Sequence, residues 1–421
     1  MPSPFATRDA QTRIKHSILK DYAGAFLSII GSHYKRYVGR TDAPAVSFAY
    51  VDGFGGQGRY QRDTDGTLHT QPIWGSPIIG MKAFEEAARP LREYGVQVNL
   101  SGIIVEENRG NFDTLVQNVA LAGLSTPHQV VQEIRQAEQG KINLLNADFR
   151  AVIAALVPWL ARHYTLALVD PYGTGMPMSA LRPLLARERT DAIVLFPFMD
   201  VVRKGASIRK PPELRTPGDN GNVTRVAAVF EDAAWEAIAT DLALDVHQRE
   251  AAYQELYGRR LRGLDPALVV KNIPLRLSAA DRTVYYLFLT TRDPDGALRM
   301  NSILRSAGLR EHFALYSDLV ERRRLAEEAR GEISLFEALG VPLAPPAVPT
   351  EQLVVDRDEL KRVIRERCPP GTVLTLKDLR RRMANDVYIE AEIGSALTAL
   401  KAEGAVQYTS AKRVTDVLTF V

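Results

Sequence analysis

Residues 46–58 read Val-Ser-Phe-Ala-Tyr-Val-Asp-Gly-Phe-Gly-Gly-Gln-Gly, an apolar run that ends at Asp52 and continues into four glycines within six positions. Glycine adopts positive φ and lets the backbone approach a ligand closely, because it has no Cβ. In open α/β sheets, nucleotide-like ligands bind at loops of this kind, at the carboxyl ends of strands. The segment therefore predicts a parallel sheet with a ligand site after one of its strands.

The glycine loop fits two known patterns. The dinucleotide fingerprint G-x-G-x-x-G is matched by Gly53, Gly55 and Gly58. The D-x-F-x-G-x-G loop typical of S-adenosylmethionine-dependent methyltransferases is matched by Asp52, Phe54, Gly56 and Gly58. The two patterns predict different proteins, and the residues that follow the loop discriminate between them.

The residues after the loop favour the methyltransferase pattern. A dinucleotide site needs a helix at the third glycine and an acid about 20 residues later. Here the next helix is expected only from Ser76, and the next acid at a strand end is Glu106. An ionised carboxylate at that point accepts two hydrogen bonds, as from the two ribose hydroxyls of the cofactor. Asp148, after the third strand, would accept from the adenine amino group, and Asp52 would lie near the methionine end.

The predicted cofactor is therefore S-adenosylmethionine. Its predicted binding residues lie in the glycine loop and at two later strand ends. They are Asp52, Gly53, Phe54, Gly55, Gly56, Gly58, Glu106 and Asp148. The alternative, that these are ordinary strand-end loops with solvated acids, stays open, most of all for Asp148.

A second motif, Asp170-Pro171-Tyr172-Gly173, follows the fourth expected strand. It is similar to the D-P-P-Y loop of amino-methyltransferases, which orients an exocyclic amine and stacks an aromatic ring on the target base. Such stacking contributes about 1–3 kcal/mol per base. The second proline is missing and the tyrosine comes one place early, so a plain Asp-Pro turn is the alternative. We predict a catalytic role for Asp170, Pro171 and Tyr172.

Strands alternate with helices through the first half of the chain, which indicates a doubly wound, mostly parallel sheet. Two later apolar runs, 269–277 and 283–290, predict an antiparallel hairpin that closes one edge. The expected fold is a Rossmann-like class I methyltransferase domain over residues 1–340, which includes an N-terminal helix over 10–38. The expected strands of its parallel part are 46–52, 96–105, 142–145, 165–169 and 191–196.

A basic insertion at 203–225 interrupts this pattern. Its prolines and glycines predict a loop rather than a helix. Basic side chains bind phosphate groups, although a solvated flexible loop is an equal alternative. The predicted residues for substrate or phosphate binding are Lys15, Arg203, Lys204, Arg209 and Lys210.

Prolines at four positions between 342 and 349 predict a linker over 341–350. The following segment, 351–421, shows three helical patterns and two terminal β-like runs, and this spacing is typical of a winged helix. Arg380-Arg381-Arg382 lies where such a domain can touch a nucleic-acid backbone. The acidic start of its third helix at Glu390 opposes phosphate, which favours a protein contact or a structural role.

Composition narrows the class further. The 421 residues carry a net charge of +3 and a single cysteine, Cys368, which excludes intramolecular disulfides and thiolate-rich metal sites. The seven histidines are scattered, so no metal site is expected. The N-terminus lacks a signal-peptide pattern, and apolar runs stop short of about 18 residues. We therefore expect a cytoplasmic protein that does not enter a membrane.

Taken in order, several segments resemble one family, the three-Cys-motif partner proteins. They are Lys15-His16, 50–60, Gly75-Ser76-Pro77, 169–173 with Met176-Pro177-Met178, and 285–291 with Asp295-Gly296 and Met300. This bacterial and phage family is predicted to consist of Rossmann-like methyltransferases encoded beside a radical enzyme with three cysteines. The resemblance covers roughly residues 10–310, with Gly55 and Tyr172 as mild departures. It implies a methyltransferase-like sheet and a possible three-cysteine, radical S-adenosylmethionine-like partner.

The resulting expectation is a methyltransferase that acts on a nucleic acid or a nucleotide-like substrate. The alternative is a non-catalytic partner that keeps the same sheet and serves a neighbouring enzyme. A nicotinamide-dependent oxidoreductase is the third possibility, and it is the one that the delayed helix and the distant acid Glu106 disfavour.

Overall fold

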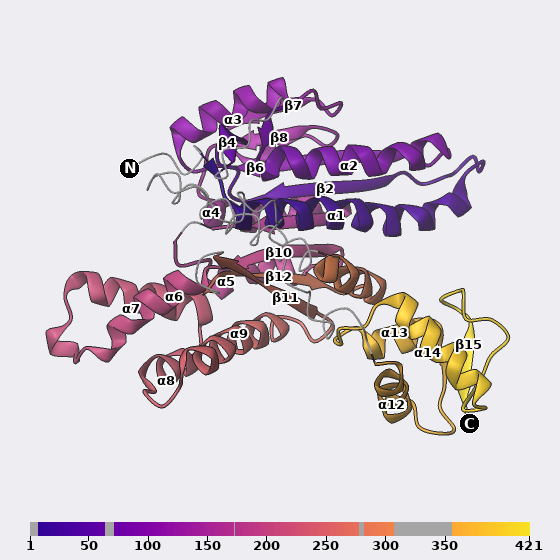
Figure 1. Ribbon diagram of the computed structural model, residues 1–421. Coiled ribbons are helices and arrows are strands. Elements are labelled where there is room, and N and C mark those ends of the chain that lie inside the picture. The colour runs from indigo at the N-terminus through magenta and orange to yellow at the C-terminus, as the bar shows by residue number, and fades with distance from the viewer. Residues whose placement is uncertain (1–6, 64–70, 172, 278–281, 307–355) are drawn as a thin grey trace, which may run out of the picture.

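A computed structural model describes residues 7–63, 71–171, 173–277, 282–306 and 356–421 (Figure 1). Tyr172 and the predicted linker 341–350 lie outside the described residues, so their predicted roles stay predictions. Within the described part of the chain, no helix combines the length and the apolar character needed to cross a membrane.

The centre of the molecule is an eight-stranded sheet with the order β11-β12-β10-β9-β2-β6-β8-β7. Every pair of neighbours is parallel except those that involve β12, which runs antiparallel to both β10 and β11. The predicted mostly parallel α/β sheet with an edge hairpin is confirmed, and the edge strand β7 was not predicted. The strands are β2 (Val46–Asp52), β6 (Val98–Val105), β7 (His128–Val131), β8 (Ile142–Leu145), β9 (Tyr164–Val169), β10 (Thr190–Phe196), β11 (Val269–Leu277) and β12 (Arg282–Thr291).

Strand β2 lies at the point where the strand order reverses. The chain leaves β2 to form β6 on one side and later returns to form β9 on the other side. In open α/β sheets such a reversal creates a crevice beyond the carboxyl ends of the two strands. The glycine loop and Asp170 both follow strands at this crevice.

Helices cover both faces of the sheet (Figure 1). Successive side chains of β2 point to opposite faces of the sheet, and both faces are buried. Phe48 and Tyr50 pack with α1, α2 and α3, whereas Ala49 and Val51 pack with α4 to α9. The helices are α1 (Ala10–Ser32), α2 (Ser76–Glu93), α3 (Arg109–Leu121), α4 (Phe149–Trp159), α5 (Met178–Leu185), α6 (Phe198–Gly205), α7 (Pro217–Phe230), α8 (Ala234–Thr240) and α9 (Val246–Arg262).

Shorter elements complete this part. The strand pairs are β1 (Thr7–Arg8) with β4 (Arg62–Asp63), and β3 (Arg59–Tyr60) with β5 (Ile73–Trp74). Single 3₁₀ turns cover His33–Tyr37, Ile134–Gln136, Leu160–Arg162, Ala206–Arg209 and Pro212–Leu214. The expected first helix over 10–38 is therefore an α-helix to Ser32 that continues as a 3₁₀ turn.

The prediction of a loop over the basic insertion was wrong, because α7 begins inside it. The Thr216 side chain accepts from the Asp219 N–H, and the Asp219 carboxylate accepts from the Thr216 N–H, which forms a capping box. Pro217 occupies the first helical position, where its missing N–H costs nothing. The same prolines and glycines that predicted a loop therefore mark the start of a helix.

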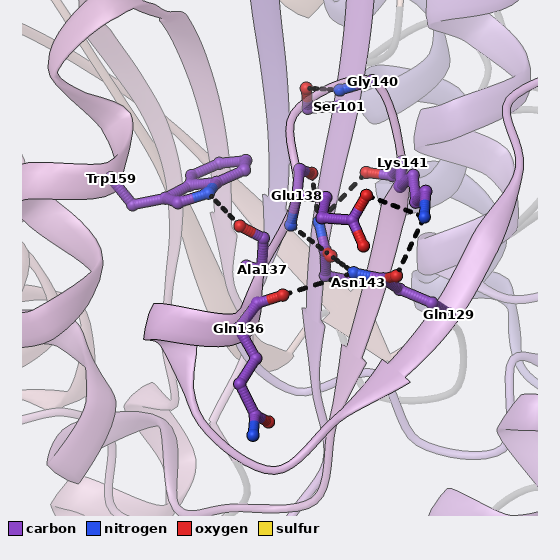
Figure 2. Close-up of polar contacts among 9 residues, drawn as sticks. All are labelled: Ser101, Gln129, Gln136, Ala137, Glu138, Gly140, Lys141, Asn143 and Trp159. Atoms are coloured by element: carbon purple, nitrogen blue, oxygen red, sulfur yellow. Dashed lines mark hydrogen bonds and ion pairs between the residues drawn. The ribbon is translucent and has the colours of Figure 1, made fainter.

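A buried asparagine holds the segment between β7 and β8 (Figure 2). Asn143 Nδ2 donates to the carbonyls of Gly102 (3.2 Å), Glu138 (2.9 Å) and Lys141 (3.1 Å). Its Oδ1 accepts from Gln129 Nε2 (2.8 Å) and from the Glu138 N–H (3.0 Å). A side chain at the start of β8 thus fixes the connection that leads into that strand.

The C-terminal part has its own core, which also includes Leu298 from the helical segment 294–306. Arg380 pairs with Asp295 (2.7 Å), and Asn301 Nδ2 donates to the Asp386 carbonyl (2.8 Å), so this part is docked on the first one. Its sheet has the order β13-β15-β14. The elements are α12 (Arg357–Arg367), β13 (Val373–Thr375), α13 (Leu376–Met383), α14 (Glu390–Ala402), β14 (Val406–Gln407) and β15 (Val417–Phe420).

Candidate functional site

The glycine loop connects the carboxyl ends of three neighbouring strands. The Gly53 N–H donates to the Leu168 carbonyl of β9 (3.1 Å), and the Gly55 N–H donates to the Val105 carbonyl of β6 (2.8 Å). A Cβ on Gly53 would lie 2.5 Å from the ring of Phe149, and Gly58 has φ +69°. Packing and backbone conformation alone therefore require these two glycines.

Glu106 supports this loop from the end of β6. Its Oε2 accepts from the Gly56 N–H (2.8 Å) and its Oε1 accepts from the Asn108 N–H (2.8 Å), and the residue is buried. An ionised carboxylate has about four acceptor positions, so each oxygen keeps one more. Glu106 therefore holds the loop through both oxygens and keeps unused acceptor positions, although its side chain is buried.

Asp148 has a partner within its own helix. It is the N-cap of α4, where its carboxylate accepts from the Arg150 N–H (2.9 Å). Capping residues of this type contribute about 1 kcal/mol to helix stability. The structure thus gives Asp148 a local role that needs no ligand.

Asp52 is fully buried beneath the loop. Its carboxylate accepts from the Phe54 N–H (3.1 Å) and from the Tyr50 hydroxyl (3.1 Å). Burial raises the pKa of Asp52 to about 6, although hydrogen bonds from Ser76, Phe54 and Tyr50 oppose the shift. Asp52 therefore fixes the first turn of the loop and titrates closer to neutral pH than an exposed carboxyl.

A cavity of about 200 Å³ opens between the glycine loop and the end of β9. The predicted residues that it brings together are Lys15, Phe54, Gly55, Gly56, Gly58, Asp170 and Pro171. Its lining does not include the predicted residues Asp52, Gly53, Glu106 and Asp148, nor the predicted basic residues of the insertion. The structure thus brings only part of the predicted residues together, and Lys15 and Asp170 lie among them.

Lys15 and Asp170 form an ion pair in the wall of this cavity. Lys15 lies in the second turn of α1, and its Nζ donates to Asp170 Oδ2 at the end of β9. The two side chains are only 11% and 22% exposed. Burial opposes the charged form of Lys15, but the Asp170 carboxylate raises the pKa of the ammonium above its ordinary value overall. The cavity therefore presents a positive and a negative group side by side.

Two tyrosines, Tyr60 and Tyr285, also line the cavity. Tyr60 belongs to the small β3–β5 pair, and Tyr285 comes from β12. Burial raises the pKa of both phenols, so they are neutral at physiological pH. Sequence reasoning did not assign either residue to the site. Tyr60 lies two residues after the last glycine, whereas nothing in the sequence places Tyr285 near Asp170.

His16 lies behind this wall, with its ring centroid 5.8 Å from that of Tyr60. Burial first, and then the charges of Lys15 and Arg8, lower the pKa of His16 well below its ordinary value. The imidazole is therefore neutral. It packs behind the site and does not line the cavity.

The basic residues of the insertion make contacts within the protein. Arg209 Nε donates to the Ala239 carbonyl (2.7 Å), and Lys210 pairs with Asp219 (2.8 Å). Arg203 pairs with Asp200. These contacts give Arg203, Arg209 and Lys210 partners within the protein, so no phosphate ligand is needed to account for their positions.

Lys204 is the one residue of this group next to the site. Its Nζ donates to Thr174 Oγ1 (2.6 Å) and pairs with Asp200 (2.6 Å). A Cβ on Gly173, which lines the cavity, would lie 3.9 Å from this Nζ. Lys204 therefore holds the loop after Asp170 in place.

No family model matches this chain, and a search of curated proteins finds no match either. Among the described residues, no group of three or more His, Cys, Asp or Glu side chains is arranged to hold a metal ion.

Proposed function

We propose that this protein is an S-adenosylmethionine-dependent methyltransferase that acts on a nucleic acid or a nucleotide-like substrate. One observation carries the proposal: Asp170, at the end of β9, and the glycine loop, at the end of β2, line the same cavity. Ligands of open α/β sheets bind at this kind of crevice. The antiparallel β12 between β10 and β11 also suits a class I methyltransferase sheet.

The donors and acceptors at the carboxyl edge fit this cofactor. Glu106 retains acceptor positions suited to a ribose diol, and Gly56 and Gly58 bring backbone close to the cavity. The volume of about 200 Å³ is smaller than the 300–1,000 Å³ typical of sites for whole ligands. We therefore expect the loop to shift when the cofactor binds, with Glu106 exchanging the Gly56 N–H for a hydroxyl.

The bound cofactor would supply an activated methyl group. Asp170 would accept a hydrogen bond from the acceptor substrate, Pro171 would shape the turn that places it, and Asp52 would keep the loop in register. Orientation and fixed charges are the sources of rate in such a site, because the reacting carbon is already activated.

Calorimetric titration with S-adenosylhomocysteine tests the proposal. We expect binding by the wild-type protein and a loss of about tenfold or more in Glu106→Gln, because a hydrogen bond to a charged group contributes about 1.5–3 kcal/mol. Glu107→Gln is the matched control, since Glu107 is the exposed neighbour. Absence of binding of both S-adenosylmethionine and S-adenosylhomocysteine by the wild-type protein would overturn the proposal.

A second candidate is a non-catalytic partner of a three-cysteine radical S-adenosylmethionine-like protein. Glu106 and Asp148 both accept from the protein's own backbone N–H groups, which favours this alternative. Docking would use the C-terminal part, whose three helices and small antiparallel sheet suit a winged helix. Affinity purification from the native host, combined with transfer of a labelled methyl group, separates the two candidates. A stoichiometric partner without methyl transfer would favour the second.

A further inference from the structure

Basic and aromatic side chains gather at the other end of α1 from Lys15. The 3₁₀ turn His33–Tyr37 follows α1 directly, and its five positions include two tyrosines and two basic residues. At about 1.5 Å per residue, the helix places this turn roughly 30 Å from Lys15. The turn lies at the amino end of the parallel strands, because Tyr34 is hydrogen-bonded with Tyr164, the first residue of β9.

Two arginines of this region lie over the ring of Tyr37. The guanidinium carbons of Arg36 and Arg40 are 4.9 Å and 5.3 Å from the centroid of that ring. Among the described residues, neither guanidinium has a hydrogen bond or an ion pair, and both residues are exposed. A cation–π contact holds a guanidinium in place without a carboxylate, so its N–H donors stay available to an external anion.

The same kind of contact recurs at two neighbouring positions. Lys35 Nζ lies 4.8 Å from the ring centroid of Tyr94, which is 56% exposed at the end of α2. The Arg189 guanidinium lies 5.0 Å from the ring centroid of Tyr164. Burial and a hydrogen bond with Tyr164 raise the pKa of Tyr34 to about 12, so this phenol adds no negative charge. Four cations are thus held on tyrosine rings, and within the part of the chain that the structure describes no carboxylate pairs with them.

The segments that meet at this end of the sheet are strongly basic. Together they contain eight lysines and arginines and three carboxylates, whereas the whole chain has a net charge of only +3. The segments are 32–42, 89–95, 160–164 and 187–190. We call the cations Lys35, Arg36, Arg40 and Arg189, with the tyrosine rings that they contact, the basic–aromatic patch. A local excess of positive charge of this kind attracts a polyanion.

We propose that the basic–aromatic patch binds a single strand of nucleic acid. Arg36 and Arg40 donate to phosphate groups, and an unpaired base stacks on the exposed ring of Tyr94. The rings favour a single strand over a duplex or a lipid surface, because only unpaired bases offer a free face for stacking. The patch shares no residue with the cavity, so the inference holds whether or not the proposed methyltransferase activity does.

Fluorescence anisotropy of the full-length protein tests the inference. The probes are labelled oligothymidylate and oligouridylate of about 15 nucleotides, within the range of site sizes for single strands. We expect at least one of them to bind, and an abasic strand of equal length to bind about fivefold or more weakly, because it has no bases to stack. Absence of binding to both strands, equal binding of the abasic strand, or binding of phosphatidylserine vesicles in their place would overturn the inference.

A double variant assigns the phosphate contacts. Arg36→Gln/Arg40→Gln should weaken strand binding about tenfold or more, because it removes two charged donors. It should also lower the slope of log affinity against log salt by about 1.4, since each phosphate contact contributes about 0.7 for a single strand.

The matched control removes the same charge elsewhere. Arg225→Gln/Arg259→Gln changes two exposed arginines, in α7 and α9, and should alter the affinity by about twofold or less. Equal strand binding by the two double variants would overturn the inference.

Tyr94→Ala separates stacking from charge. It should lower the affinity about fivefold or more and leave the salt slope unchanged, because it removes a ring and no charge. An unchanged affinity in this variant would overturn the stacking role of Tyr94.

A parallel titration with S-adenosylhomocysteine distinguishes this inference from the proposed function. Cofactor binding by a protein whose strand binding ignores the patch variants overturns the inference and leaves the methyltransferase proposal intact. Strand binding that depends on the patch, without cofactor binding, supports the inference and contradicts the methyltransferase.

Discussion

The cavity beside Lys15 and the network around Asn143 are two polar clusters of one sheet, the first at the carboxyl ends of β2 and β9 and the second at the start of β8. Asn143 is neutral, and its amide makes five hydrogen bonds to groups of the neighbouring segments. Figure 2 shows those to Gln129, Glu138 and Lys141. Lys15 and Asp170 are charged, lie against a cavity, and use only part of their bonding capacity on each other.

The difference separates a structural cluster from a candidate functional one. A buried polar group whose bonds are all made within the protein stabilises one conformation and offers nothing to a ligand. A charged pair with spare donors and acceptors at a cavity gains from a ligand that completes its bonds. Saturation of hydrogen bonds is therefore a better guide to the site than burial, which both clusters share.

Asn143→Ala should have the largest effect on stability. It removes five hydrogen bonds and leaves the Glu138 N–H and three carbonyls without this partner, so we expect a loss of about 3 kcal/mol or more in the free energy of unfolding. Urea denaturation measures the change. Gln139→Ala, at an exposed position in the same segment, is the control and should change stability by about 0.5 kcal/mol or less. A loss below about 1 kcal/mol in Asn143→Ala would contradict a structural role for the network.

Replacement of the whole charged pair should have the opposite effect. Exchange of a buried ion pair for apolar residues is often neutral or stabilising by about 1–4 kcal/mol, because both desolvation costs disappear. We expect Lys15→Met/Asp170→Leu to unfold at equal or higher denaturant concentration and to lose ligand binding. The single variant Asp170→Leu should be less stable than the double variant, because it leaves Lys15 buried without its partner. A double variant that is strongly destabilised would show that the pair serves stability.

A smaller effect is expected from Asp191, a buried carboxyl at the start of β10. Burial raises the pKa of Asp191 to about 7, although hydrogen bonds from Tyr22 (2.7 Å) and Thr291 oppose the shift. The folded state therefore holds this proton more tightly than the unfolded state, whose carboxyl has an ordinary pKa of 3.8. The contribution to stability is complete below about pH 4 and is lost as the pH rises to about 7.

Asp191→Asn should remove this contribution. The free energy of unfolding should then fall by at least about 1 kcal/mol less between pH 4 and pH 7 than it does in the wild type. Denaturation curves of the wild type and the variant at several pH values between 4 and 7 measure the difference. Identical slopes in the two proteins would show that Asp191 has an ordinary pKa in the folded state.

The parallel sheet could be predicted from the sequence because each strand is a short apolar run that ends at a polar or glycine-rich turn. Asp52 and Asp170 follow such runs directly, so their position at one edge follows from strand direction alone. The hairpin β11–β12 could be predicted for the same reason. The periodicity of single elements is visible in the sequence. The positions of Asp52 and Asp170 at the sheet edge depend on that periodicity alone.

The remaining features depend on contacts between distant elements. The proximity of Tyr285 to Lys15 follows from the insertion of β12 beside β10, and no local pattern encodes that pairing. The role of Glu106 as a support of the loop depends on a hydrogen bond to Gly56, fifty positions away. The start of α7 was missed for a different reason, since proline and glycine mark helix starts as well as loops.

The wall of the cavity combines residues of α1, the first helix of the chain, with residues of β11 and β12, the last two strands of the central sheet in chain order. Lys15 lies in α1, whereas Leu275 and Tyr285 lie in β11 and β12, which form only after almost the whole first part has been made. During synthesis from the N-terminus, the parallel strands can therefore assemble long before the pocket exists. A chain that ends before β11 would keep most of the sheet and have an open, incomplete pocket, so ligand binding reports whether this part of the protein has been completed.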